Sequence, residues 1–132
     1  MKRLLDSLAK HFDVSAPATR SEIAEAETSL NYSFPADYTD FLLMTNGLEG
    51  KGGDGYLVLW SAKELIELNA AYQVKEFVAD VIIFGSDGAE EAFGFDTSVV
   101  PAAIIKLPFI GMGYVPNERL AGSFEEFLAG KI

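Results

Sequence analysis

The residues most suited to chemistry lie in the stretch IIFGSDGAEEAFGFD, at positions 82–96. An apolar run enters a turn there, and the chain then presents four carboxylates: Asp87, Glu90, Glu91 and Asp96. Such side chains bind a divalent cation, exchange protons in catalysis, or form a charged surface for a partner. The acids lack the alternate spacing of an EF-hand loop. Asp87-Gly88 is instead typical of a tight hairpin turn, because glycine accepts a positive φ, so the stretch favours a hairpin over a metal site.

The other combinations that could support catalysis are less specific. His11 is the single histidine and no cysteine is present, so a hydrolase triad would have to use His11 without a G-x-S-x-G elbow. The missing cysteine also excludes a disulfide framework and a thiolate zinc site. Glycosidases use two carboxyl groups at a characteristic distance, but among twenty acidic residues some pair always lies at that distance, so this signal is not specific. We therefore expect no enzyme, no metal and no cofactor, and a hydrolytic or metal-dependent enzyme is the weakest alternative.

The glycine-rich stretch GLEGKGGDG at 47–55 resembles a phosphate-binding loop only superficially. A P-loop places its lysine after the last glycine, between a strand and a helix. Here the lysine precedes two glycines and a predicted strand follows, so we expect a flexible surface loop.

Composition limits the class of partner. The 132 residues suit one domain, which we assign to 1–132. Twenty acidic residues against ten basic ones leave a formal charge of −10. This charge should repel nucleic acid and anionic membranes and could attract a basic protein, although it also serves simple solubility. Because Asp6, Lys10 and Asp13 interrupt the first apolar positions, we expect no secretory signal and a cytoplasmic protein.

Several helices are predicted around these residues. Leu4, Leu8 and Phe12 share one face of an N-terminal helix that also carries His11. Capping boxes, in which two side chains satisfy backbone N–H groups at a helix start, are expected at Thr19 with Glu22, Ser61 with Glu64, and Ser123 with Glu126.

One further helix follows a proline. Pro35 suits its first position, and Tyr38, Phe41 and Leu42 form its apolar stripe. Asn46-Gly47 is expected to end it, because both residues tolerate the left-handed backbone of a C-terminal cap.

Strand patterns occupy most of the second half. The run 81–85 is continuously apolar, as expected of a central strand, and 91–96 alternates like a half-buried one. Strands are also expected at 56–60, at 102–108 and, briefly, at GYV (113–115). Short connections between successive strands favour an antiparallel β-sheet flanked by helices, an α+β architecture.

Four motifs in order resemble the SUKH superfamily, which contains the Smi/Knr-like proteins and many bacterial immunity proteins. They are AEAETSLNYSFPADYTDFLLMTNGL, LWSAKELIELNAAY, IIFGSDGAEEAFGFD and SFEEFLAG, which together cover roughly residues 19–130. Leu48, Asn31 and the Ala89-Glu90-Glu91 turn depart from the superfamily pattern. The resemblance implies an α+β domain that binds a protein and is not an enzyme.

The same resemblance implies two kinds of role. Bacterial members typically neutralise toxins, often nucleases, and an acidic chain suits a basic toxin domain. The alternative is a housekeeping interaction or scaffold module, such as a regulator of cell-wall assembly. For either role, the expected partner-binding surface places aromatic anchors among acids: Asp54, Tyr56, Trp60, Asp87, Glu90 and Glu91. The alternative for Trp60, at the end of a strand, is a core position.

Overall fold

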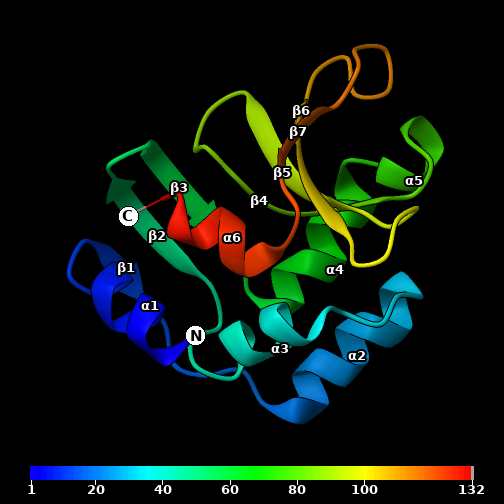
Figure 1. Ribbon diagram of the computed structural model, residues 1–132. Helices are drawn as coiled ribbons and strands as arrows, with labels where there is room; N and C mark the ends of the chain where they lie inside the picture. Colours follow the sequence, from blue (N-terminus) through cyan, green and yellow to red (C-terminus); the bar gives the residue numbers. More distant parts are fainter. Residues whose placement is uncertain (132) are drawn as a thin grey trace.

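Seven strands pair in the order in which they occur, and every neighbouring pair is antiparallel (Figure 1). The structure is a computed structural model that describes residues 1–131. The strands are β1 (Phe12–Val14), β2 (Leu48–Gly52), β3 (Gly55–Leu59), β4 (Val81–Ser86), β5 (Glu91–Asp96), β6 (Ala103–Pro108) and β7 (Glu118–Ala121). The helices are α1 (Lys2–Leu8), α2 (Arg20–Leu30), α3 (Ala36–Leu42), α4 (Ala62–Ala71), α5 (Val74–Phe77) and α6 (Phe124–Ala129). The predicted α+β class is confirmed.

The central strands are buried on both faces. All six residues of β4 are buried, as the continuous apolar run predicts. The expectation that 91–96 is half-buried is wrong: Ala92 and Phe93 point to opposite faces of β5, and both are buried. On one side of the sheet, α4 is tied to β4 by Asn69, whose side chain bonds both the N–H and the carbonyl of Ile83.

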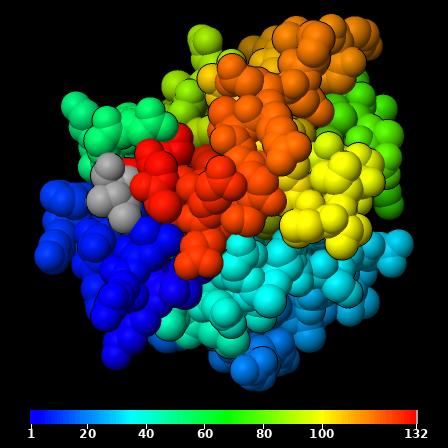
Figure 2. All heavy atoms as spheres, in the orientation of Figure 1, coloured from blue at the N-terminus to red at the C-terminus, as the bar shows by residue number. Residues whose placement is uncertain are grey.

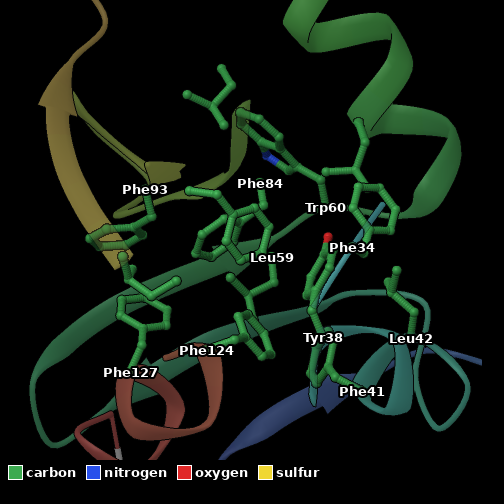
Figure 3. Close-up of a cluster of buried hydrophobic side chains, with 14 of the residues drawn as sticks. Phe34, Tyr38, Phe41, Leu42, Leu59, Trp60, Phe84, Phe93, Phe124 and Phe127 are labelled. Carbon is green, nitrogen blue, oxygen red and sulfur yellow. The ribbon is translucent and has the colours of Figure 1, made fainter. Parts of the chain in front are cut away.

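An aromatic cluster joins the helices to the other face of the sheet. The ring of Tyr38 in α3 lies 5.0 Å from Phe95 in β5 and 4.8 Å from Phe124 in α6, between centroids. Phe84 in β4 lies 5.6 Å from Phe127 in α6 and 5.8 Å from Tyr38. Figure 3 shows the rings of Tyr38, Phe84, Phe124 and Phe127 converging from α3, α6 and the sheet. The apolar stripe predicted at Tyr38, Phe41 and Leu42 is therefore confirmed as part of the core.

The predicted capping boxes are confirmed at two helices, and only one of the two expected hydrogen bonds is present at the third. Thr19 and Ser61 both form reciprocal boxes, at the starts of α2 and α4. At α6 the Ser123 hydroxyl accepts from the N–H of Glu126, but the Glu126 carboxylate accepts from the N–H of Gly122. The third box is therefore incomplete.

The first predicted helix is too long. Helix α1 ends at Leu8, His11 lies in an exposed turn, and Phe12 opens β1. Phe12 keeps its buried position because its ring packs beside Gly50 and Gly52 of β2. The helical spacing of Phe12 is thus coincidental, since a strand buries the same side chain.

Helix α3 also has different ends from those predicted. Pro35 is its N-cap residue, and the helix stops at Leu42, before Asn46-Gly47. The N–H groups of residues 43–45 still donate to Thr39 and Phe41 in a last turn. The chain leaves this turn at Asn46, whose N–H donates to the carbonyl of Ala16 and whose side chain accepts from the N–H of Ala62. These long-range bonds compete with further helical turns.

The stretch 47–55 is not a flexible loop. It forms β2 and the tight turn into β3, with Gly52 paired to Gly55. A Cβ at Gly50 would lie 2.9 Å from the carbonyl oxygen of His11. Glycine is therefore required at Gly50, where β1 pairs closely alongside β2. The glycines therefore serve close packing of strands.

The short strand expected at 113–115 is absent as well. These residues belong to the connection between β6 and β7, and β7 begins at Glu118. Gly111 and Gly113 have φ of 85° and 88°, which turn the chain out of strand geometry.

Removing one buried hydroxyl should stabilise the fold. The Tyr38 hydroxyl has no hydrogen-bond partner among the described residues, and burial raises the pKa of Tyr38, so the group stays protonated and unpaired. We expect Tyr38→Phe to raise the free energy of unfolding by about 1 kcal/mol, because an unpaired buried polar group is lost. Denaturant unfolding of the wild type and the variant measures this change in the free energy of unfolding.

The control is Tyr56→Phe, which removes a hydroxyl that is bonded and exposed. Its free energy of unfolding should change much less than that of Tyr38→Phe, because substitutions at exposed positions have small effects. A Tyr38→Phe protein less stable than the wild type would contradict the interpretation.

Candidate protein-binding rim

Three hairpin connections lie at the same end of the sheet. In an antiparallel meander successive connections alternate between the two ends, so the β2–β3 (53–54), β4–β5 (87–90) and β6–β7 (109–117) connections share one end. Figure 1 shows them from the left to the upper right of the view. We call these three connections and the strand residues next to them the hairpin rim. The helical connections leave from the opposite end.

The β4–β5 connection is the predicted Asp-Gly turn. The carboxylate of Asp87 accepts from the N–H groups of Ala89 and Glu91, at 2.9 and 3.2 Å, and Gly88 has a φ of 79°. Asp87 is therefore occupied in shaping the turn, whereas Glu90 is exposed. Among residues 1–131, no three His, Asp or Glu side chains are placed to hold a metal ion.

Tyr56 joins the first hairpin to the second. Its ring lies against Gly88, where an added Cβ would approach within 2.7 Å. Its hydroxyl donates to the carboxylate of Glu49 at 2.5 Å, and this bond, with burial and the charges of Glu49 and Asp13, raises the pKa of Tyr56. The ring remains 43% exposed, which leaves it available to a partner.

Asp54 is held by a lysine that is itself buried. The ammonium of Lys131 lies 2.8 Å from the Asp54 carboxylate and 4.8 Å from the centre of the Phe93 ring. The hydrogen bond and charge of Lys131 lower the pKa of Asp54, and the charge of Lys106 acts in the same direction. The aliphatic stem of Lys131 thus packs in the protein while its charge reaches the surface.

Lys106 is the second lysine of the rim and is surrounded by acids. It forms an ion pair with Glu118 at 3.2 Å. The hydrogen bond and charge of Glu118 raise the pKa of Lys106, and the charges of Glu91 and Asp87 add to the effect. The rim carboxylates outnumber the ammonium groups. The acids are Glu49, Asp54, Asp87, Glu90, Glu91 and Glu118, and the lysines are Lys51, Lys106 and Lys131.

The structure brings five of the six predicted partner-binding residues into this rim. These are Asp54, Tyr56, Asp87, Glu90 and Glu91. Trp60 is the exception: it is only 6% exposed and packs near Phe109, with ring centroids 6.5 Å apart. Its predicted place as an exposed anchor is therefore wrong, because the side chain is part of the core.

Sequence reasoning missed Glu49 and all three rim lysines. Glu49 lay in the stretch interpreted as a loop, although Leu48, Gly50 and Gly52 alternate there with Glu49 and Lys51. That period of two is the strand signal that could have placed Glu49 on the same face as Tyr56. Nothing local indicates that Lys131, distant in sequence, pairs with Asp54.

The sequence profile of the SMI1/KNR4 family (SUKH-1) matches residues 17–130, and the chain belongs to this family. Members of the family typically bind protein partners. The chain is also similar to the uncharacterised protein YnaB of Bacillus subtilis (strain 168), with 34% identity over 74 residues. That match covers 56% of this chain and 47% of YnaB, about half of the relative's length. In the described residues no helix has the length and apolar character needed to span a bilayer.

Removing the charge of Lys131 should change how Asp54 titrates. Because Lys131 lowers the folded-state pKa of Asp54, the pair stabilises the fold above the unfolded pKa, and this stabilisation is lost as pH falls through the folded pKa. We expect Lys131→Met to raise the pKa of Asp54 toward its ordinary value. Carboxyl carbon NMR titration measures the shift.

Lys63→Met is the matched control, because the side chain of Lys63 is 82% exposed and pairs with Glu67 on α4. It should leave the titration of Asp54 unchanged. An Asp54 that titrates identically in the wild type and in Lys131→Met would refute the assigned pair.

Proposed function

We propose that this protein is a cytoplasmic, non-catalytic immunity protein that binds a basic toxin domain through its hairpin rim. The observation that supports this most is the gathering of six carboxylates around three lysines and the exposed ring of Tyr56 at one end of the sheet. Membership of a family that typically binds protein partners agrees with a binding role.

The charge of the rim favours a basic partner. A nuclease presents Lys and Arg to phosphates, so an acidic protein can cover that surface and deny it to nucleic acid. The whole-chain charge of −10 attracts such a partner over distance, and the local acids orient it. Tyr56 then supplies a large amphipathic contact, a residue type enriched at binding hot spots.

Capture followed by a growth assay tests the proposal. The tagged protein is used to retain proteins from lysate of its source cells at low and high salt, and the retained protein is then expressed alone and with this chain. A basic protein that arrests growth unless this chain is co-expressed is the expected result. Retention of a harmless wall or signalling protein would favour the housekeeping module, and retention of nothing would count against the proposal.

Reversing the charges of the exposed Glu90, in the β4–β5 turn, and of the half-buried Glu91, at the start of β5, should slow association. We expect the double variant Glu90→Lys, Glu91→Lys to lower the association rate constant for the captured partner by about tenfold at low salt, and to flatten its salt dependence. Stopped-flow or surface plasmon resonance over a salt series measures both quantities. The physical reason is that long-range attraction acts on the rate of encounter.

Glu25→Lys with Asp40→Lys is the control, because it changes the net charge equally at exposed positions on α2 and α3, away from the rim (Figure 1). This variant should slow association less than the rim variant does. Equal slowing by both pairs would show that net charge alone acts and that the turn is not at the interface.

A further inference from the structure

The β6–β7 connection exposes apolar side chains to an unusual degree. Ile110 is 93% exposed, Tyr114 is 83% exposed and Val115 is 51% exposed, within six consecutive residues. Single exposed apolar residues are ordinary, but a contiguous group of this kind marks a contact surface. Figure 2 shows the segment that contains this connection, in orange, at the upper edge of the molecule.

Contacts with the rest of the protein fix the conformation of the β6–β7 connection. Met112, in its centre, is 3% exposed and belongs to the core. Phe109 stacks on Tyr72 at 4.6 Å between ring centroids, and its N–H donates to the carbonyl of Glu90 at 3.0 Å. With Phe109 and Met112 both anchored, Ile110 between them is directed outward.

Gly113 fixes the outer part of the connection. It approaches the carbonyl of Phe77 so closely that no Cβ could fit, and its φ of 88° suits glycine. The following residue, Tyr114, donates its N–H to the carbonyl of Gly111, which closes the turn. Phe77, at the end of α5, is itself 48% exposed and extends the apolar surface beside the turn. We call Phe77, Ile110, Tyr114 and Val115 the apolar patch.

Acidic residues border the apolar patch. The backbone bond between Phe109 and Glu90 places the acidic β4–β5 turn directly beside it, and Glu118 follows it in the chain. The surface therefore combines an apolar projection with carboxylates along one side. Its complement is an apolar depression bordered by Lys or Arg.

We propose that Ile110 and Tyr114 insert into an apolar depression of the same basic partner whose Lys and Arg residues face the acidic turn. This inference rests on the proposed function and adds the contact that keeps the complex together. A second copy of this chain is a poorer occupant, because each copy carries a formal charge of −10 and the two would repel each other.

The two contacts have different kinetic effects. Charges at the rim act mainly on encounter, whereas buried aromatic and aliphatic anchors act mainly on dissociation. We expect Ile110→Ser and Tyr114→Ser each to raise the dissociation rate constant by about tenfold or more, with little change in the association rate constant. Val100→Ser is the matched control, because Val100 is 97% exposed on the β5–β6 connection at the other end of the sheet. It should bind like the wild type.

The probe is the protein retained by the wild-type chain, purified and measured by surface plasmon resonance against each variant. Thermal unfolding verifies that each variant is folded, which surface positions permit. If no partner is retained, the proposed function fails and the inference fails with it. If the partner binds Ile110→Ser and Tyr114→Ser as tightly as the wild type, only the inference is overturned. A wild-type dimer that Ile110→Ser dissociates, seen by analytical ultracentrifugation, would also overturn it.

Discussion

Nearest-neighbour antiparallel pairing from β1 to β7 is the constraint on which the rest of the structure depends. Because each strand reverses the direction of the one before, the connections separate into two groups at opposite ends of the sheet. The long ones carry α2, α3, α4 and α5, which return to cover the sheet. The β2–β3, β4–β5 and β6–β7 connections, with the strand residues next to them, carry the rim acids, Tyr56 and three of the four apolar patch residues, Ile110, Tyr114 and Val115. The division between stabilising segments and exposed segments is therefore a product of topology.

The predictable parts of the fold are those whose local pattern agrees with the global packing. The apolar run of β4, the Asp-Gly turn at Asp87 and the reciprocal caps at Thr19 and Ser61 were all readable, because neighbours in sequence decide them. The wrong predictions concern segments whose conformation depends on contacts with residues distant in sequence. Gly50 is a strand residue that pairs with Phe12 of β1, and the chain after α3 turns away at Asn46, whose N–H donates to the distant Ala16.

The candidate site follows the same rule. The acids of the β4–β5 turn were predictable because hairpin turns are exposed, and Tyr56 was predictable as the start of a strand. Trp60 was misplaced because its burial depends on Phe109, almost fifty residues away in the chain. The apolar side chains of the β6–β7 connection were interpreted as a strand because Tyr and Val favour strands, whereas the glycines around them set the turn.

The contribution of α6 to the aromatic cluster has a consequence for the order of events during synthesis. Phe124 and Phe127 supply rings that lie within 6 Å of Tyr38 and of Phe84, so the core formed by α3 and β4 has no cover until residue 127 has been made. Nascent chains on the ribosome therefore lack a closed interior until α6 has emerged. Products of translation interrupted before α6 would present these rings to proteases and chaperones.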